Sequence, residues 1–374
     1  MPEAATSTAF KLDDRRSKLT DLVAVQSIDQ RHGAVRRYPG TMPAPPSQKC
    51  RVLLDTNVWS NVAREDQVEA VRKVARGNGV EIVASPAVVY ELLRTSNPEF
   101  RRRDLKAVTL SSWSRPMSDT FQLAEELRSE ISRLHPEWLR NPPDLASWHA
   151  QRADWAGSKG FWLQARRHPE VIHQVIANLE QNQIGVARSE FKAERESTTI
   201  EFADLDLSKV TSIFVDRPAG WEGEKIEAWR TTAYAIWTKG LFGSSSRALY
   251  REWLGPWVDL KEVGRNESPW IRFWIYEVDR DRMPLHWLAF AFTVAATTRK
   301  VTPGTPVDCQ IGLYLPACEF FVTGDRVFGE IVDKVRQWSP VKLGEVRVLP
   351  SGKDGALELV RFLASLGGSV KAPE

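Results

Sequence analysis

Short apolar runs alternate with helical patterns near the start of the chain. Residues 50–54 (Cys-Arg-Val-Leu-Leu) and 80–84 (Val-Glu-Ile-Val-Ala) are typical of strands buried in a parallel sheet. Between them, residues 57–76 carry apolar side chains at helical spacing, and Ser85 and Pro86 supply the N-cap and first-turn proline of another helix. This strand–helix–strand–helix order predicts βαβ units and a parallel sheet.

The same alternation returns after residue 284. The predicted elements are helices at 285–300 and 307–315, a strand at 319–323, a helix at 326–338, a strand at 345–349 and a helix at 354–366. We therefore expect one α/β domain whose two parts are residues 50–104 and residues 285–374.

The residues between these parts, 105–284, lack the alternation. Helical patterns occur at 119–134, 169–182, 222–239, 245–257 and 269–278, and this segment holds most of the 15 tryptophans of the chain. Trp270 and Trp274 are four residues apart and share a helix face, as do Trp253 and Trp257. This spacing favours core packing over stacking on nucleic-acid bases. The segment is expected to be a mostly helical, Trp-rich insertion that splits the α/β domain.

Residues 1–49 have a different character from the rest of the chain. A short helix is predicted at 11–30, whereas residues 36–49 contain four prolines and a glycine. Proline and glycine at this density are typical of a linker or a surface arm.

Composition narrows the class of protein. Of 374 residues, 42% are hydrophobic and 26% are charged, proportions that exclude a disordered or fibrous chain. The net charge of only +3 does not indicate nucleic-acid binding driven by bulk charge. The apolar stretch 285–297 is shorter than the roughly 18–20 residues that span a bilayer. Cys50, Cys309 and Cys318 are too scattered for a disulfide framework or a zinc site. Without a secretory signal pattern at the N-terminus, we expect a cytoplasmic protein that does not associate with membranes.

Four acidic residues fall at related places in the predicted framework. Asp55 ends the first strand, Asp325 follows the strand at 319–323, and Glu91 and Asp308 lie in helices next to the sheet. Open parallel sheets bind ligands at the carboxyl ends of their strands. Carboxylates that converge there repel one another, so the cluster indicates hard divalent cations. Two such ions about 3.5–4 Å apart would activate water and stabilise the leaving oxygen of a phosphodiester, which predicts a nuclease.

The segments around these acids resemble the four successive signatures of the PIN domain family. They are residues 53–58 (Leu-Leu-Asp-Thr-Asn-Val), residues 85–92 (Ser-Pro-Ala-Val-Val-Tyr-Glu-Leu), Asp308, and residues 321–328 (Phe-Val-Thr-Gly-Asp-Arg-Val-Phe). The resemblance covers residues 50–104 and 285–350 and implies a Rossmann-like α/β/α sandwich. Asp308 follows Glu91 by 217 residues, far beyond the family's usual spacing, so the insertion must loop out of the sheet.

The resemblance also assigns roles to individual residues. The catalytic and metal-binding acids would be Asp55, Glu91, Asp308 and Asp325, with Mg²⁺ or Mn²⁺ as cofactor. Asn57 and Thr323 match the polar residues that accompany the first and last acid and hold them in place. Glu91 would bind a second ion or orient the attacking water. The implied activity is endonucleolytic hydrolysis of single-stranded or structured RNA, leaving 5′-phosphate and 3′-hydroxyl ends.

Arginines near these acids are candidate phosphate contacts, because Arg and Lys supply most of the affinity for a nucleic-acid backbone. They are Arg94, Arg101, Arg102, Arg103 and Arg326. The run at 101–103 is equally well explained as a solvated charged stretch. Each acid taken alone is also explained as a helix cap, a turn residue or a solvated helix residue. It is the joint order of the four acids that favours a metal site.

Two other functions stay open at this point. One is a noncatalytic PIN-like scaffold that binds RNA or protein through its Trp-rich insertion, and the other is a single-strand or flap DNA nuclease. Many small PIN proteins are toxins that a partner protein inhibits. The resemblance is therefore also compatible with a toxin-like or defence-related role, an inhibitory protein partner and a homo-oligomer.

Overall fold

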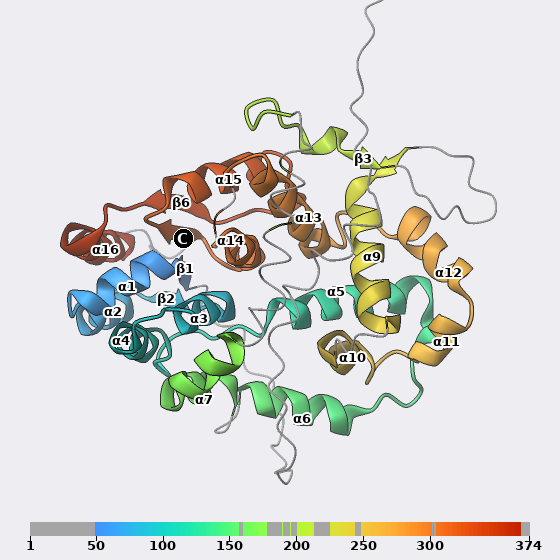
Figure 1. The fold of residues 1–374 in the computed structure, drawn as a ribbon, viewed down its shortest axis with the longest axis horizontal. Helices are drawn as coiled ribbons and strands as arrows, with labels where there is room; N and C mark the ends of the chain where they lie inside the picture. The colour runs from blue at the N-terminus through green and yellow to red at the C-terminus, as the bar shows by residue number, and fades with distance from the viewer. Residues whose placement is uncertain are drawn as a thin grey trace, which may run out of the picture.

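The structure is a computed structural model of the chain. It describes residues 49–156, 160–177, 200–212, 225–243, 248–300, 302 and 304–367, together with the single residues 189 and 195 (Figure 1). The predicted helix at 11–30 and almost all of the proline-rich segment at 36–49 lie outside the described residues.

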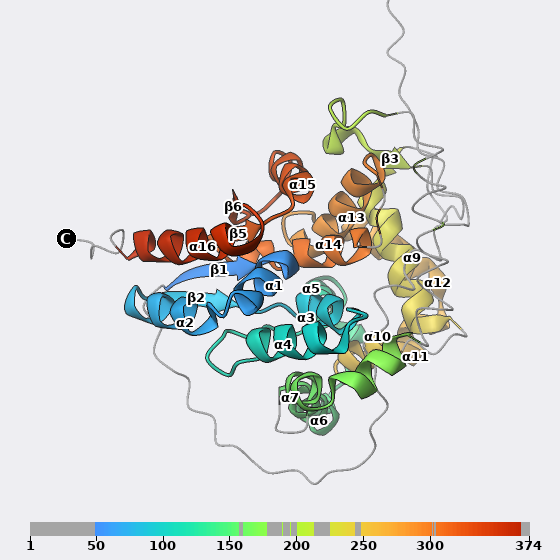
Figure 2. The same cartoon turned by 60° about the vertical axis from the view of Figure 1, so that its left-hand side comes forward.

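A parallel sheet brings together two parts of the chain that are far apart in the sequence (Figures 1 and 2). Its strands are β1 (Cys50–Leu54), β2 (Val80–Val83), β5 (Phe320–Thr323) and β6 (Glu345–Val348), in the order β2-β1-β5-β6. All neighbouring pairs are parallel, and β1 pairs with β5 from Val52 opposite Phe320 to Leu54 opposite Val322. The α/β class and the assembly of one sheet from two distant segments are thus confirmed.

The sheet continues beyond the expected boundary at residue 104. Ser114 forms a parallel bridge with Val83, because its N–H donates to Ile82 O at 2.9 Å and its carbonyl accepts from Ala84 N at 2.9 Å. A single bridging residue leaves no apolar run in the sequence, so the pattern did not reveal it. Ser114, which lies in the segment expected to be the insertion, thus pairs with the edge of the sheet.

The helices around the sheet come from both parts of the α/β domain. They are α1 (Thr56–Arg64), α2 (Val68–Gly77), α3 (Pro86–Leu93), α4 (Pro98–Val108), α13 (Pro284–Thr297), α14 (Thr305–Gly312), α15 (Arg326–Arg336) and α16 (Gly352–Leu366). Helix α1 packs against α4 and α16, α14 packs against α3 and α13, and α15 contacts β5 and β6. Helices from distant parts of the sequence therefore lie together around the sheet.

One predicted helix, residues 57–76, was wrong as a single element. The structure has two helices there, α1 and α2, separated by a turn in which Asp66 has a φ of 53°. Asp is one of the few residue types that adopts this left-handed conformation readily. Apolar spacing continues through the turn, which is why the sequence pattern did not show the break.

The insertion gathers beside the sheet, on the side away from α2 and α16 (Figures 1 and 2). Its elements are α5 (Asp119–Leu134), α6 (Leu145–Ala156), α7 (Phe161–Arg167), a helical segment at 169–177, the strand pair β3 (Thr211–Ser212) and β4 (Ile226–Glu227), α9 (Ala228–Phe242), α10 (Ala248–Leu254), α11 (Leu260–Arg265), α12 (Glu267–Arg272) and a π-helical turn (Phe273–Glu277). Short 3₁₀ turns occur at Pro136–Trp138, Leu207–Lys209 and Leu315–Ala317. Trp229, Trp237, Trp270 and Trp274 are almost fully buried, which confirms the expectation of core packing for these side chains.

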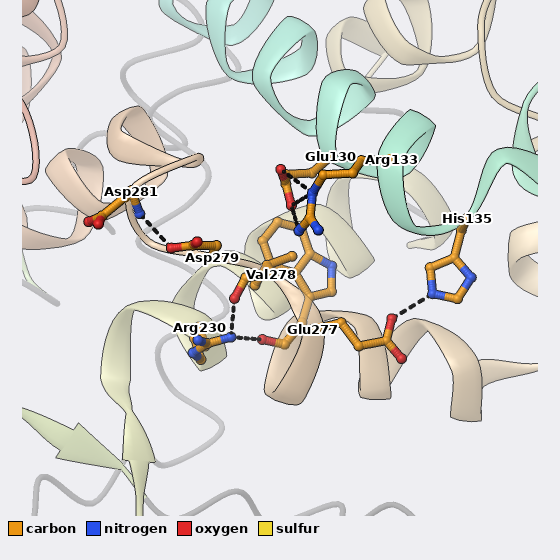
Figure 3. Close-up of polar contacts among 9 residues, drawn as sticks. Glu130, Arg133, His135, Arg230, Glu277, Val278, Asp279 and Asp281 are labelled. Carbon is orange, nitrogen blue, oxygen red and sulfur yellow. Dashed lines mark hydrogen bonds and ion pairs between the residues drawn. The ribbon is translucent and has the colours of Figure 1, made fainter.

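Polar contacts fix the end of α5 to the segment after α12 (Figure 3). His135 Nε2 lies 2.6 Å from Glu277 Oε2, and the guanidinium of Arg230 donates to Val278 O at 2.6 Å. The buried Glu130 accepts a hydrogen bond from Arg133 at 2.5 Å. These contacts tie α5, α9 and the π-helical turn together into one helical layer.

A buried chain of hydrogen bonds joins this layer to α13. Trp237 Nε1 donates to His286 Nε2 at 2.7 Å, and His286 Nδ1 lies 2.6 Å from Glu126 Oε2. Because Nε2 accepts a hydrogen bond, His286 is neutral and carries its proton on Nδ1. Glu126 also accepts from the backbone N–H groups of Leu285 and His286 at the start of α13.

Among the described helices, none has the length and apolar character needed to cross a bilayer.

Candidate active site

Asp55 lies where β1 ends and α1 begins. Its backbone N–H donates to Val322 O at 2.9 Å and so continues the β1–β5 ladder. One carboxylate oxygen accepts from Thr56 N at 2.7 Å, and the other accepts from Asn57 Nδ2 at 2.8 Å and from Thr323 Oγ1 at 2.6 Å. The side chain is therefore buried and held in one orientation by the ends of two adjacent strands. Asn57 and Thr323 therefore both donate hydrogen bonds to Asp55.

The turn after β5 connects Asp325 to this group. Asp325 N donates to Thr323 Oγ1 at 2.9 Å, and Gly324 N donates to Asn57 Oδ1 at 2.7 Å. Asp325 also caps α15, since its Oδ1 accepts from Val327 N at 2.7 Å and from Phe328 N at 3.1 Å. Asn57 and Thr323 thus each link Asp55 to the loop that carries Asp325.

Thr56 links Asp55 to Glu91. Its hydroxyl donates to Glu91 Oε2 at 2.6 Å, although the two residues are 35 positions apart. The sequence analysis did not predict that Thr56 contacts Glu91. Only the position of Thr56 between Asp55 and Asn57, at the first turn of α1, could have indicated it. On the other side of Glu91, a Cβ atom on Gly304 would lie 3.4 Å from Glu91 Oε1 and 3.9 Å from Asp308 Oδ2. The carboxylates of Glu91 and Asp308 therefore both face the backbone of Gly304.

Burial and repulsion from neighbouring charges both raise the pKa of Asp55 and of Glu91. Burial raises the pKa of Asp55, and the charge of Asp325 adds to the effect, while hydrogen bonds from Thr323, Thr56 and Asn57 oppose it. Burial raises the pKa of Glu91 to about 7, opposed by the Thr56 hydroxyl and the charge of Arg94.

The pKa of Asp308 is raised by burial and by the charges of all three other acids. Its pKa lies well above the usual range, first because of burial and then because of the charges of Glu91, Asp55 and Asp325. The structure thus brings the four acids singled out by the sequence into one electrostatic neighbourhood at the carboxyl ends of β1 and β5.

The donor chemistry of this neighbourhood can be compared with the needs of a metal ion. Within the described ranges, no group of three or more His, Cys, Asp or Glu side chains has the spacing of a preformed ligand set. All candidate donors here are oxygen atoms, the type that Mg²⁺ and Mn²⁺ prefer. Mg²⁺ usually binds through one or two carboxylates and keeps several waters. The donor atoms are thus of the type that these ions prefer, but the described residues do not form a ligand set for one.

A cavity of about 170 Å³ opens beside two of the acids, Asp308 and Asp325. Its charged wall also includes Arg299 and Lys300, at the end of α13. Its apolar wall consists of Phe292, Ala296, Val327, Phe328 and Ile331. The cavity is a place where a ligand could contact an apolar surface and the acids at the same time.

The arginine run at 101–103 lies on α4. Arg101 is 3% exposed, pairs with Glu170 and donates to Thr95 O, so the interpretation of this residue as a phosphate contact is corrected to a structural ion pair. Arg102 is more exposed and also pairs with Glu170, at 2.9 Å. Arg103 pairs with Asp104 at 2.9 Å. An open groove of about 520 Å³ is lined by Arg102 and Arg103 together with Lys106 and Arg166.

The other two candidate arginines lie close to the acids in the chain. Arg94 caps the C-terminal end of α3, and its charge lowers the pKa of Glu91. Arg326 is exposed and is the first residue of α15, directly after Asp325. Both positions keep these residues in consideration as phosphate contacts. Arg299 and Lys300, in contrast, were not among the candidates, because nothing in the sequence linked them to the acids.

Comparisons of the chain with family models, with curated proteins and with solved structures found no match.

Proposed function

We propose that the protein is a Mg²⁺- or Mn²⁺-dependent endoribonuclease of the PIN-like type. One observation supports the proposal: Asp55 is linked to Glu91 through Thr56 and to Asp325 through Thr323, and, together with burial, the charges of these three acids raise the pKa of Asp308. Gathering like charges in a partly buried crevice costs free energy. A scaffold that only binds RNA or protein has no use for such a cluster, whereas phosphodiester hydrolysis assisted by metal ions does.

The proposed mechanism divides the work between the ion and the chain. A bound divalent ion would supply charge stabilisation at the phosphate and a more acidic water. Asp55 and Asp308 present carboxylate oxygens at the edge of the sheet. Asn57 and Thr323 keep Asp55 in place through hydrogen bonds at 2.8 and 2.6 Å. Outer residues of this kind typically contribute about 10–100-fold to metal affinity or activity.

Glu91 lies next to the first helical turn after β1. The hydroxyl of Thr56 fixes one of its carboxylate oxygens at 2.6 Å. We assign to Glu91 the binding of a second ion or the orientation of the attacking water, and to Thr56 the positioning of Glu91.

Cleavage assays on purified variants test the proposal. Wild-type protein with Mn²⁺ is expected to cut single-stranded RNA, and Asp55→Asn and Asp308→Asn are each expected to lose at least about 100-fold in rate, beyond the usual effect of an outer residue. Asp354→Asn, at an exposed acid of α16, is the matched control and should cleave like wild type.

The outcomes separate the competing functions. If wild type with Mn²⁺ cuts RNA no faster than Asp55→Asn, the enzyme is excluded and the scaffold function is favoured. Matched DNA oligonucleotides are offered in parallel. Faster cleavage of DNA than of RNA would contradict the assignment of RNA as the substrate and indicate a DNA nuclease.

A further inference from the structure

The cavity between α13 and α15 has an apolar interior next to the acids. Phe292 and Ala296 come from α13, and Phe328 and Ile331 come from α15; all four are buried. Val327, the second residue of α15, lines the same cavity and is 46% exposed. Val327 therefore extends the apolar wall of the cavity to the surface, and a concave apolar site with a few polar groups at its rim is typical of a ligand site.

The volume of the cavity limits what can enter it. An engineered apolar cavity of about 150 Å³ binds benzene. At about 170 Å³, this cavity has room for one six-membered ring. The two fused rings of a purine would not be fully enclosed.

The polar groups at the rim define the rest of the ligand. Asp308 and Asp325 lie on one side, and the hydroxyls of Thr302 and Thr305 lie nearby. Lys300, at the end of α13, is exposed, whereas Arg299 is held by an ion pair with Glu330. A planar ring with polar edges, joined to an anionic phosphate, matches this combination of an apolar interior, hydroxyl groups and a cation.

We propose that this cavity binds one unstacked pyrimidine base of a single-stranded substrate, next to the phosphate that is cut. The proposal rests on the proposed nuclease function and names the substrate that the site selects. A base must leave its stack to enter the cavity, which costs least in single strands. The apolar wall then buries the face of the base, and Lys300 lies within reach of the backbone.

Removal of single bases from the substrate tests the proposal without altering the protein. A single-stranded RNA with one mapped cleavage site is made in versions that each lack one base near the cut. At one position, loss of a pyrimidine is expected to raise KM about tenfold while changing kcat less. Replacement of that pyrimidine by a purine should give an intermediate KM.

A cavity-filling variant supplies the second arm. Ala296→Leu adds bulk to the cavity wall and should weaken binding of the intact RNA to the level of the version that lacks the base. Ala289→Leu is the matched control, since Ala289 lies in the same helix but does not line the cavity. It should retain the difference between the two RNAs.

Binding measured without cleavage separates this inference from the proposed function. Fluorescence anisotropy with Ca²⁺ compares ten-nucleotide oligouridine and oligoadenosine strands. Wild type should bind oligouridine several-fold more tightly, and Ala296→Leu should bind both alike. If wild type cuts RNA but every base can be removed without effect, or if it binds both strands equally, the pyrimidine site is overturned while the nuclease function stands. If wild type does not cut RNA but still prefers oligouridine, the nuclease function fails and the pyrimidine site stands.

Discussion

The hydroxyl of Thr323, at the end of β5, contacts two of the four acids, Asp55 and the backbone of Asp325. Its removal therefore tests the site at the scale of a single residue. This hydroxyl donates to Asp55 and accepts from the backbone N–H of Asp325. Thr323→Val removes both hydrogen bonds with little change in shape. We expect kcat/KM to fall about 10–100-fold, since outer residues that orient metal ligands have effects of this size.

Cleavage kinetics of Thr323→Val give the change in kcat/KM, and urea denaturation of the same variant gives any change in the free energy of unfolding. Thr298→Val is the control, because the Thr298 hydroxyl donates only to Ala295 O in its own helix among the contacts of the described residues. Unchanged cleavage by Thr323→Val would contradict the role of this hydroxyl in orienting Asp55.

Asp119 gives a second prediction at this scale, one that concerns stability. Its carboxylate is buried at the start of α5, neither oxygen has a hydrogen-bond partner among the described residues, and burial raises its pKa to about 6. The folded pKa lies above the unfolded pKa. The folded state is thus favoured by protonation of Asp119, and this stability is lost as the pH rises from about 4 through about 6.

Asp119→Asn cannot ionise and should not show this loss. Relative to wild type, its free energy of unfolding is expected to increase by up to about 3 kcal/mol between pH 4 and pH 7, the value of a shift of about two pKa units. Denaturation with urea across this range checks it, with Asp354→Asn as an exposed control. Curves for Asp119→Asn and wild type that run parallel with pH would contradict the account.

At the scale of the element, the turn from β5 to α15 depends on the small size of Gly324. A Cβ atom there would lie 3.0 Å from Asn57 Oδ1, the oxygen that accepts the hydrogen bond from Gly324 N at 2.7 Å. Gly324→Ala is therefore expected to push Asn57 away from Asp55 and to lower kcat/KM by about tenfold, the lower end of the range for outer residues. Gly77→Ala, at a position where a Cβ atom would meet nothing within 4 Å, controls for loss of glycine alone. Equal kinetics for the two variants would show that the turn does not position Asn57.

The sequence predicted elements best where local pattern and tertiary structure agree. The strand at 50–54 and the helix at 119–134 were predicted with the bounds that the structure has, because apolar runs and a capping serine mark them. The break between α1 and α2 depends on the left-handed conformation of Asp66, to which apolar spacing is blind. The pairing of Ser114 depends on a neighbouring strand rather than on its own segment.

The site shows the same division. The four acids could be singled out because each follows a recognisable strand or lies in a helix next to one. Thr56 could not be, because its role depends on a hydrogen bond to Glu91, 35 residues away. Arg101 was misread because its partner Glu170 lies 69 residues away, in the insertion.

At the scale of the whole molecule, the insertion and the sheet are joined by Glu126, His286 and Trp237. Trp237→Phe would remove the donor to His286 Nε2 and leave that buried nitrogen without its partner. We expect a loss of about 1–3 kcal/mol in the free energy of unfolding. Because α9 and α13 also pack directly against each other, the variant should still unfold in one transition.

Two probes followed in the same denaturation check this expectation. Tryptophan fluorescence reports mainly on the insertion, which holds most of the tryptophans, and far-ultraviolet circular dichroism reports on the whole chain. Coincident curves indicate one cooperative unit. Two separate transitions in wild type would show that the insertion is an independent domain.

In the proposed site, four acids from distant parts of the chain act together on a divalent ion. Titration calorimetry with Mn²⁺ measures this directly, on wild type and on Asp55→Asn, Glu91→Gln, Asp308→Asn and Asp325→Asn, with Asp354→Asn as control. Wild type and the control are expected to bind Mn²⁺ with the same Kd, and each of the four variants is expected to bind at least about tenfold more weakly. Equal Kd values in all six proteins, or no Mn²⁺ binding by wild type, would exclude a shared metal site.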